Sequence, residues 1–421
     1  MFRKFFQELI SFQKSERLFI FFAMVVGFSI AAEYGITRPA SNSLFLTLFS
    51  SHAFPWVWLA TVPLNLLIIT LYNRFLPRLG PWKMLATIAI AVTVVNCATG
   101  WLLAFFPGLI FFQFAWKDIY VLLMFKQLWS LIHSTIPSHR AKYLYGAIFG
   151  VGTVGSVLGS LIPGFLAVEI GSQQIFYFTV PIYALLLWSY RKAYHYSALS
   201  QTSFPQDLST DHRPREGFAL IFRSRFLLSI LLLVILMQVS VALLEFQFNA
   251  RLEQNILSPD LRTEYMGRMV FFMNLISGLF QWIGSFLLVH TLGVRGSHLT
   301  IPLLLIINAV GTLFVPSFGM LSFAFVFIKA VDFSLFGITR EMLYIPLQLD
   351  EKFRAKAVID VFAYRTSKAL VSLCILALQF FATGNLLFWI SGASLGVLIL
   401  WIGVVWFLLR KHYPKTPIPQ M

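Results

Sequence analysis

Charged residues are scarce in this sequence of 421 residues: Asp, Glu, Lys and Arg together make up 12% of it, whereas hydrophobic residues make up 58%. Soluble domains carry about 25% charged and about 45–50% apolar residues. So few charges cannot cover a soluble core with polar surface, so the composition excludes a soluble globular protein. It predicts an all-α protein that crosses a membrane many times, because helices satisfy their backbone hydrogen bonds internally.

Cysteine is equally scarce. The two cysteines, Cys97 and Cys374, lie in apolar runs, which excludes a disulfide framework and a zinc site. The sequence also lacks a P-loop, a nucleophile elbow and a metal-ligand cluster. Gly150-Val-Gly152-Thr-Val-Gly155 matches the dinucleotide-binding pattern letter for letter, but it runs through one apolar segment, where small residues instead favour close helix packing. We therefore expect no metal, no cofactor and no enzymatic activity.

Twelve apolar segments follow one another along the chain, each long enough to cross about 30 Å of hydrocarbon. The segments are 18–49, 55–76, 82–106, 117–137, 141–168, 173–190, 222–250, 265–290, 298–315, 319–346, 353–382 and 385–410. The one long polar stretch, 191–221, reads as a cytoplasmic linker. The sequence thus predicts twelve transmembrane helices in two six-helix bundles, 1–190 and 222–421.

The distribution of basic residues predicts the topology of the chain. The net charge is +15, with 32 Lys and Arg. Twenty-two of them fall in the tails and in alternate connections, and four fall on the opposite side. The four are Lys117, Arg251, Arg262 and Arg268. This asymmetry follows the positive-inside rule, so we expect both termini in the cytoplasm and no nucleic-acid partner.

An internal repeat divides the chain at half its length. Glu33 and Glu245 lie 212 residues apart, each inside an apolar segment. Two further pairs recur at nearly the same spacing: Leu79-Gly80 with Leu292-Gly293, and Arg140-Ala-Lys142 with Arg354-Ala-Lys356. Two parallel copies of one helix bundle are typical of secondary transporters, which hold the substrate between the halves. The repeat therefore predicts pseudo-symmetric bundles and a transport function.

Eleven ionisable residues lie within the predicted spans, where each costs at least about 2.5–3.5 kcal/mol and cannot face lipid. They are Arg38, Lys126, Lys329, Arg340, Arg365, Lys368, Glu33, Glu245, Asp332, Glu341 and Asp360. Most fall on the first, fourth, seventh and tenth segments, the helices that line the central cavity of a twelve-helix transporter. We therefore predict that these charges mark the substrate path.

The chemistry of these side chains predicts an anionic substrate. Lys126 and Arg340 lie 214 residues apart, and with Arg38 they would supply the cations that bind phosphate or carboxylate. Glu33 and Glu245 would pair with these cations in the empty state or carry a coupling proton; the alternative for both is a buried hydrogen bond between helices.

For the other charged residues within the spans, the sequence leaves two possible roles open. Lys329 and Asp332, three residues apart on one helix, contact the substrate or form an intrahelical ion pair that fixes packing. Asp360, Arg365 and Lys368 lie near the cytoplasmic end of the eleventh segment, where a structural gate and a ligand contact are equally consistent with the sequence.

Two stretches of sequence resemble a known family. Trp129-Ser-Leu-Ile-His133 with the segment 140–152 resembles the fourth and fifth helices of the bacterial and plastid ATP/ADP exchange carriers. Tyr344-Ile-Pro346 with 352–361 and Lys368 resembles the region of their eleventh helix. The resemblance implies the major facilitator fold, alternating access, nucleotide binding and antiport, a bacterial inner membrane and a monomer.

One departure from the family concerns the first helix. Arg38 matches the arginine of the exchangers, but Ser41 stands where a lysine would follow. The resemblance therefore implies an anionic metabolite carrier whose substrate, a nucleotide or another phosphorylated compound, can differ from ATP and ADP. The alternatives are a proton symporter of a different small solute and a polytopic enzyme or lipid-handling protein with Glu33 or Asp332 as its acid–base residue. A third alternative, a scaffold or sensor derived from a transporter, is consistent with the missing lysine.

Overall fold

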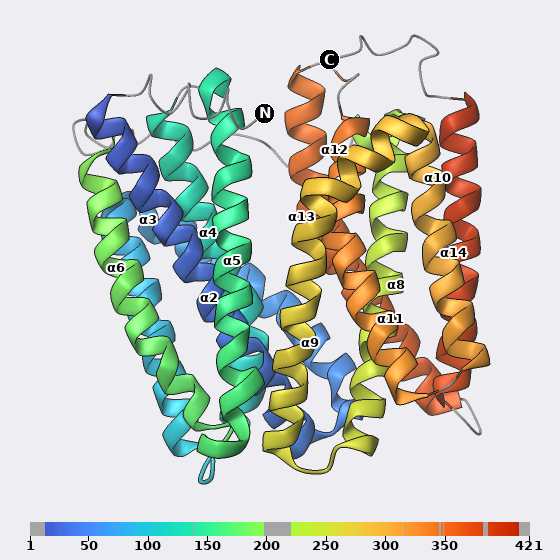
Figure 1. Cartoon of the computed structure of the whole chain (residues 1–421), viewed down its shortest axis with the longest axis horizontal. Helices are drawn as coiled ribbons and strands as arrows, with labels where there is room; N and C mark the ends of the chain where they lie inside the picture. The colour runs from blue at the N-terminus through green and yellow to red at the C-terminus, as the bar shows by residue number, and fades with distance from the viewer. Residues whose placement is uncertain are drawn as a thin grey trace. The chain divides into compact units, whose positions relative to one another are not determined.

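The computed structural model describes residues 13–136, 138–197, 220–315, 317–344, 347, 349–381 and 386–411. Within these residues every regular element is a helix (Figure 1). The twelve predicted segments all fall on helices, apart from a few residues at their ends. The prediction of an all-α fold is confirmed.

Five long helices and two short 3₁₀ turns form the first half of the described chain. They are α2 (Lys14–Phe49), η1 (Ser51–Ala53), α3 (Phe54–Leu102), α4 (Gly108–Thr135), α5 (Ser138–Ile170), η2 (Gln174–Phe178) and α6 (Thr179–His195). Helix α3 contains two predicted segments joined at a kink. Helix α4 begins nine residues before the predicted start of the fourth segment, which moves Lys117 from a connection into a helix.

The second half repeats this pattern with two π-helical insertions. Its elements are α8 (Arg225–Asn255), α9 (Pro259–Leu279), η4 (Phe280–Gly284), α10 (Ser285–Phe314), α11 (Phe318–Val331), η5 (Asp332–Phe336), α12 (Gly337–Leu343), α13 (Leu349–Phe381) and α14 (Leu386–Lys411). The π-helical η4 joins α9 to α10, and η5 joins α11 to α12. Two predicted segments therefore contain a change of helix type near their middle.

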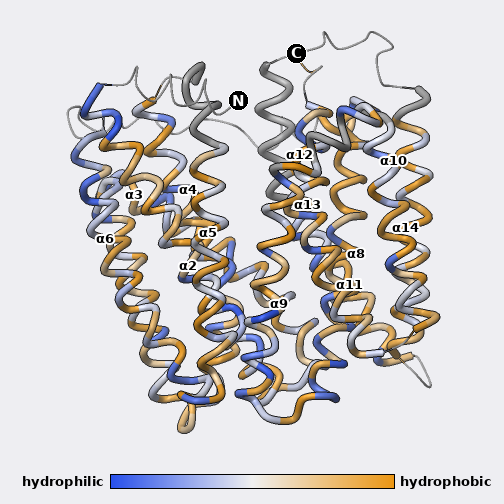
Figure 2. Tube along the Cα trace, in the orientation of Figure 1, coloured by the Kyte–Doolittle hydropathy of each residue, from blue (hydrophilic) through white to orange (hydrophobic). Residues whose placement is uncertain are grey.

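The hydropathy of the helices agrees with a membrane protein. Among the described residues, eight helical stretches are long and apolar enough to span a bilayer, and one of them, Ser51–Leu102, has the length of two spans. Helix α6 has only 17 residues. Hydrophobic residues line the helices along most of their length (Figure 2). Large apolar side chains such as Trp101, Phe105 and Phe380 are more than two-thirds exposed, as expected where lipid covers the surface.

Two glycines confirm the internal repeat in the backbone itself. Gly80 interrupts α3 with φ 72° and ψ 167°, and Gly293 interrupts α10 with φ 64° and ψ 178°. Only glycine adopts this conformation without a steric penalty. The recurring Leu-Gly pair of the sequence therefore marks the same sharp kink between consecutive spans in both halves.

The chain divides into two compact units, which are described separately below. The first consists of the described residues of Met1–Ser50, Ala60–Ser209 and Ile256–Leu275, and the second of those of Ser51–Leu59, Thr210–Asn255 and Ile276–Met421. Most of α9 thus packs with the first unit. The predicted boundary at the 191–221 linker stays a prediction, since residues 198–219 lie outside the described residues.

Close packing of α2 against α5 holds the first unit together, and glycine makes it possible. A Cβ on Gly155 or Gly159 of α5 would collide with the carbonyl oxygens of Phe28 and Ala32 in α2. On the other side, a Cβ on Gly35 would lie 2.7 Å from the carbonyl oxygen of Ser156. The interpretation of the glycine pattern as a packing motif is confirmed.

We expect Gly159→Ala to destabilise the protein and Gly146→Ala in the same helix to leave its stability unchanged or slightly raised. The added methyl at position 159 meets backbone, and overpacking costs about 1–3 kcal/mol. A Cβ at position 146 meets nothing within 4 Å, so alanine there gains only helix propensity, about 1 kcal/mol.

The measurement is the free energy of unfolding of both purified variants in mixed detergent micelles, followed by tryptophan fluorescence. Equal shifts for the two variants would contradict the packing role of Gly159.

Candidate functional site

Glu33 lies at the centre of a buried hydrogen-bond cluster in the first unit. The residue is 1% exposed. Its Oε1 accepts hydrogen bonds from Thr37 Oγ1 at 2.7 Å, from Tyr120 Oη at 2.8 Å and from Asn96 Nδ2 at 3.3 Å. These partners come from α2, α4 and α3, and each is a neutral donor. The carboxyl group therefore bridges helices without an ion-pair partner among the described residues.

The cluster extends from Asn96 to α4 and α6. Asn96 also donates to Thr179 Oγ1 at 3.2 Å and accepts a hydrogen bond from Gln113 Nε2 at 2.7 Å. The buried hydroxyl of Tyr183, also on α6, interacts with the Glu33 carboxyl group. Hydrogen bonds from three helices thus meet at the carboxyl group, α6 completes the cluster, and the buried interhelix hydrogen bond considered for Glu33 is present.

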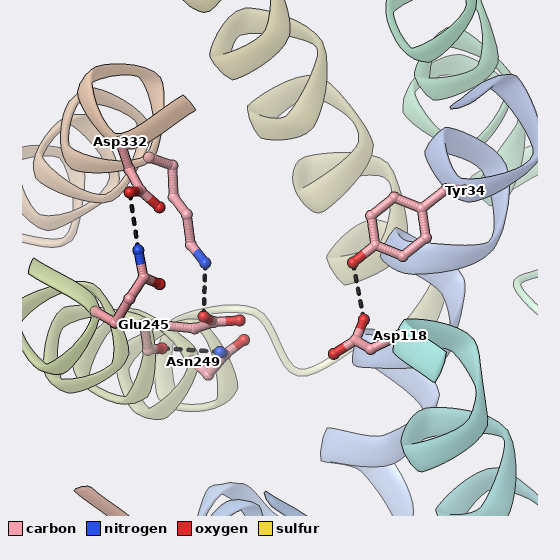
Figure 3. Close-up of polar contacts among 7 residues, drawn as sticks. Tyr34, Asp118, Glu245, Asn249 and Asp332 are labelled. Atoms are coloured by element: carbon pink, nitrogen blue, oxygen red, sulfur yellow. Dashed lines mark hydrogen bonds and ion pairs between the residues drawn. The ribbon is translucent and has the colours of Figure 1, made fainter. Parts of the chain in front are cut away.

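Arg38 lies one turn further along α2, beside a second polar contact. It is 6% exposed, and its guanidinium carbon lies 5.8 Å from the ring centre of Tyr34. The Tyr34 hydroxyl donates to Asp118 Oδ1 of α4 at 2.8 Å (Figure 3). A buried cation, an aromatic ring and a carboxylate therefore lie close together on α2 and α4.

The position of Lys117 shows that one of the sequence predictions was wrong. It was expected in a connection opposite the cytoplasm, but it lies inside α4 and is 2% exposed. Its ammonium group donates to the Phe114 carbonyl oxygen at 3.1 Å and lies 3.1 Å from the centre of that ring. The prediction failed because the apolar residues before Lys117 extend the helix back to Gly108, so that lysine is internal and not terminal.

Arg262 and Arg268, also expected in a connection, lie within α9. Arg262 is 4% exposed and donates to Thr47 Oγ1 at 3.0 Å and to the Ile256 carbonyl oxygen at 2.8 Å. Arg268 forms an ion pair with Glu264 and donates to the Gly164 carbonyl oxygen at 3.0 Å. Their role in the structure is to anchor α9 within the first unit.

In the second unit, Glu245 of α8 forms a buried ion pair with Lys329 of α11 (Figure 3). Lys329 Nζ donates to Glu245 Oε2 at 2.8 Å, and both residues are less than a tenth exposed. Beside the pair, the rings of Phe248 and Phe325 stack with their centres 4.3 Å apart. A buried ion pair is poorly screened by water, so its two partners interact strongly.

Asp332 has a different partner from the one considered for it. Its Oδ1 accepts a hydrogen bond from Gln238 Nε2 of α8 at 2.9 Å, at the start of the π-helical η5. Lys329 pairs with α8 as well. Lys329 and Asp332 thus each contact α8, in addition to the electrostatic interaction between them that was weighed from the sequence.

The two units use equivalent positions differently. Lys117 precedes Lys329 by 212 residues, the spacing of Glu33 and Glu245, and Tyr120 precedes Asp332 by the same interval. In the second unit the acid takes the lysine as its partner. In the first unit it takes the tyrosine, and the lysine contacts a backbone carbonyl and a ring. Applying the 212-residue spacing to Lys329 would have identified Lys117 from the sequence.

The other predicted site residues lie in varied surroundings. Lys126 is exposed, with its ammonium group 5.0 Å from the ring centre of Tyr72. Nη2 of Arg340 lies 3.6 Å from Oε1 of its neighbour Glu341, which makes a weak ion pair. Lys368 is half-buried, with its ammonium group 5.6 Å from the ring centre of Trp58, and Arg365 is also half-buried. The side chain of Asp360 lies outside the described residues. No group of three or more metal-ligating side chains occurs among those described.

We expect Glu245→Gln and Lys329→Gln each to lower the free energy of unfolding by about 3–5 kcal/mol, because either change leaves one buried charge without its partner. The double variant removes both charges and should be more stable than the sum of the single effects implies.

The measurement is a double-mutant cycle by chemical unfolding in mixed micelles, with Lys126→Gln, an exposed cation, as the control. Strictly additive effects would show that the pair is not coupled.

Comparison with known proteins gives two kinds of likeness. In fold, the chain is similar to the nucleoside transporter NupG, with a TM-score of 0.63 at 12% identity over 94% of this chain and 98% of that one. It is also similar to the inward-open xylose transporter XylE from E. coli, with a TM-score of 0.60 at 14% identity over 94% and 96%. These likenesses confirm the predicted major facilitator fold.

In sequence, the chain is similar to ADP,ATP carrier proteins of Rickettsia and Chlamydia species. ADP,ATP carrier protein 1 of Rickettsia typhi is 29% identical over 177 residues, which cover 37% of this chain and 35% of that protein. ADP,ATP carrier protein 1 of Chlamydia pneumoniae is 23% identical over 296 residues, 60% of this chain and 56% of that protein. Several of these alignments span about a third of the relatives' length.

The profile of the TLC ATP/ADP transporter family matches residues 115–324 and 317–413, well over half of the chain. The match includes Lys117, Glu245, Lys329 and Asp332. The chain belongs to the TLC ATP/ADP transporter family.

Proposed function

We propose that this protein is an exchange carrier that moves a nucleotide or another phosphorylated anion across a membrane by alternating access. Two findings support the proposal: the membership in a transporter family, and the buried cations of both units. We further propose that both termini lie in the cytoplasm of a bacterium, that the carrier resides in the inner membrane and that it works as a monomer.

The buried cations carry the proposal. Arg38, Lys117 and Lys329 are each less than a tenth exposed and lie on helices α2, α4 and α11. A cation at this depth costs free energy that packing alone does not require, so intramembrane charges mark substrate paths. Guanidinium groups bind phosphate through two parallel hydrogen bonds, and ammonium groups bind it as point charges. Arg340 and Lys126 would add positive charge to the path.

The ion pair in the second unit suggests how an anion is bound and released. In the structure, Lys329 donates to Glu245. A phosphate oxygen would replace this carboxylate as the partner of the ammonium group, and the carboxylate would regain it when the anion leaves. Competition of this kind lets the site hold a charged substrate without leaving a lysine unpaired in the membrane.

A second candidate, proton-coupled transport, is favoured by the surroundings of Glu33. Each of its hydrogen-bond partners among the described residues is neutral. A buried carboxyl group without a cation is easily held as the neutral acid. Glu33 could thus carry a proton in a symport cycle, whereas Glu245 forms an ion pair with Lys329.

We expect Arg38→Gln and Lys117→Gln to lower the uptake of labelled ATP into proteoliposomes by about 10- to 100-fold, the loss expected for one hydrogen bond to a charged group. Arg191→Gln, an exposed cation at the end of α6, serves as the control and should transport normally. Unchanged uptake in both Arg38→Gln and Lys117→Gln would contradict the proposal that these cations bind the substrate.

The same assay separates the two candidates. Uptake that requires internal ADP indicates exchange, whereas uptake driven by an inward proton gradient, and lost in Glu33→Gln, indicates symport. Uptake of another phosphorylated compound in place of ATP would change the substrate and retain the site.

A further inference from the structure

A groove of about 620 Å³ lies between α8 and α14 of the second unit. Its wall is apolar along its length, formed by Leu228 and Leu232 of α8 and by Leu400, Gly403 and Phe407 of α14. Leu232 and Leu400 are 39% and 59% exposed, so the groove is open at the surface of the unit. This cavity is separate from the cluster around Glu245 and Lys329.

The groove is a gap that no side chain fills. A Cβ placed on Gly403 would meet no atom within 4 Å. In a helix surrounded by lipid, such a gap is not left empty, and its apolar wall offers water no hydrogen-bond partners. Hydrocarbon is the medium around a membrane-spanning segment, so the occupant that fits this wall is an acyl chain.

One charged residue, Arg225, lies at the mouth of the groove. It is the first residue of α8 and of the apolar span Arg225–Asn255, and it is exposed. Its guanidinium group makes no hydrogen bond or ion pair with the described residues, and the nearby Ser229 hydroxyl donates to the Arg225 backbone carbonyl. An arginine at the end of an apolar span lies at the level of the lipid headgroups.

The dimensions agree with one lipid chain entering from that level. On α8 the groove extends from Arg225 to Leu232, which corresponds to roughly 10 Å along the helix. One leaflet of hydrocarbon is about 15 Å thick, half of the whole bilayer core. The groove therefore accommodates the headgroup-proximal part of an acyl chain beneath a phosphate held by Arg225.

We propose that the groove between α8 and α14 binds an anionic phospholipid, with its phosphate on Arg225 and one acyl chain along Gly403. Anionic lipid is favoured because Arg223, also exposed, adds a second positive charge near the same boundary. A basic residue near the membrane surface prefers anionic over zwitterionic lipid by about fivefold, which corresponds to about 1 kcal/mol. This proposal does not depend on the transported substrate.

The test is native mass spectrometry of the full-length protein, purified in detergent and mixed with equal amounts of phosphatidylglycerol and phosphatidylcholine. We expect wild type to retain phosphatidylglycerol with a preference of about fivefold or more. Arg225→Gln should remove most of this preference, whereas Arg191→Gln, an exposed cation outside the groove, should keep it.

A second variant tests the acyl chain separately from the charge. Gly403→Leu fills the groove without meeting any protein atom at Cβ, so the protein should fold and retain fewer lipids of both kinds. Gly392→Leu on the same helix, where a Cβ also meets nothing, is its control.

Two results would overturn the proposal. An unchanged preference in Arg225→Gln would show that the phosphate is bound elsewhere. Unchanged lipid retention in Gly403→Leu would show that the groove is filled by something other than lipid, such as a segment of the chain itself.

Discussion

The ion pair between Glu245 and Lys329 is the interaction on which the chemistry of the second unit depends. Neither charge is stable alone at this depth in a membrane, so each requires the other, or a ligand that replaces it. The pair connects α8 to α11 at 2.8 Å, next to the stacked rings of Phe248 and Phe325. The contact between α8 and α11 and the charge balance of the second unit thus depend on the same two side chains.

The first unit meets the same constraint with hydrogen bonds instead of an ion pair. Tyr120 stands where the second unit has Asp332, and its hydroxyl satisfies Glu33, so Lys117 is not required as a partner for that acid. The two halves therefore share their backbone kinks at Gly80 and Gly293 but not their electrostatics. A duplicated fold can keep its geometry while the buried charges of the two copies take different roles.

The sequence predicted the helices and their close packing because both follow from local patterns. Apolar run length identified the spans, and the glycine spacing around Gly155 and Gly159 identified a packing face on α5, although not α2 as its partner. The side-chain partners were not predictable in the same way. Whether Lys329 reaches Asp332 on its own helix or Glu245 on another depends on helix rotation, which a single sequence does not specify. Lys117 was missed because a charge near the end of an apolar run reads as a boundary.

The different partners of Glu33 and Glu245 bear on how a membrane carrier couples two solutes. An acid paired with a lysine responds to an anion that competes for the cation, and an acid surrounded by neutral donors responds to a proton. This chain holds one of each at equivalent positions of its two units. If Glu33 only holds α2, α3 and α4 together, the Glu33→Gln variant should transport normally, because the amide oxygen of glutamine can accept the same three hydrogen bonds. A loss of proton dependence alone, with the fold retained, would instead assign the two acids to separate solutes.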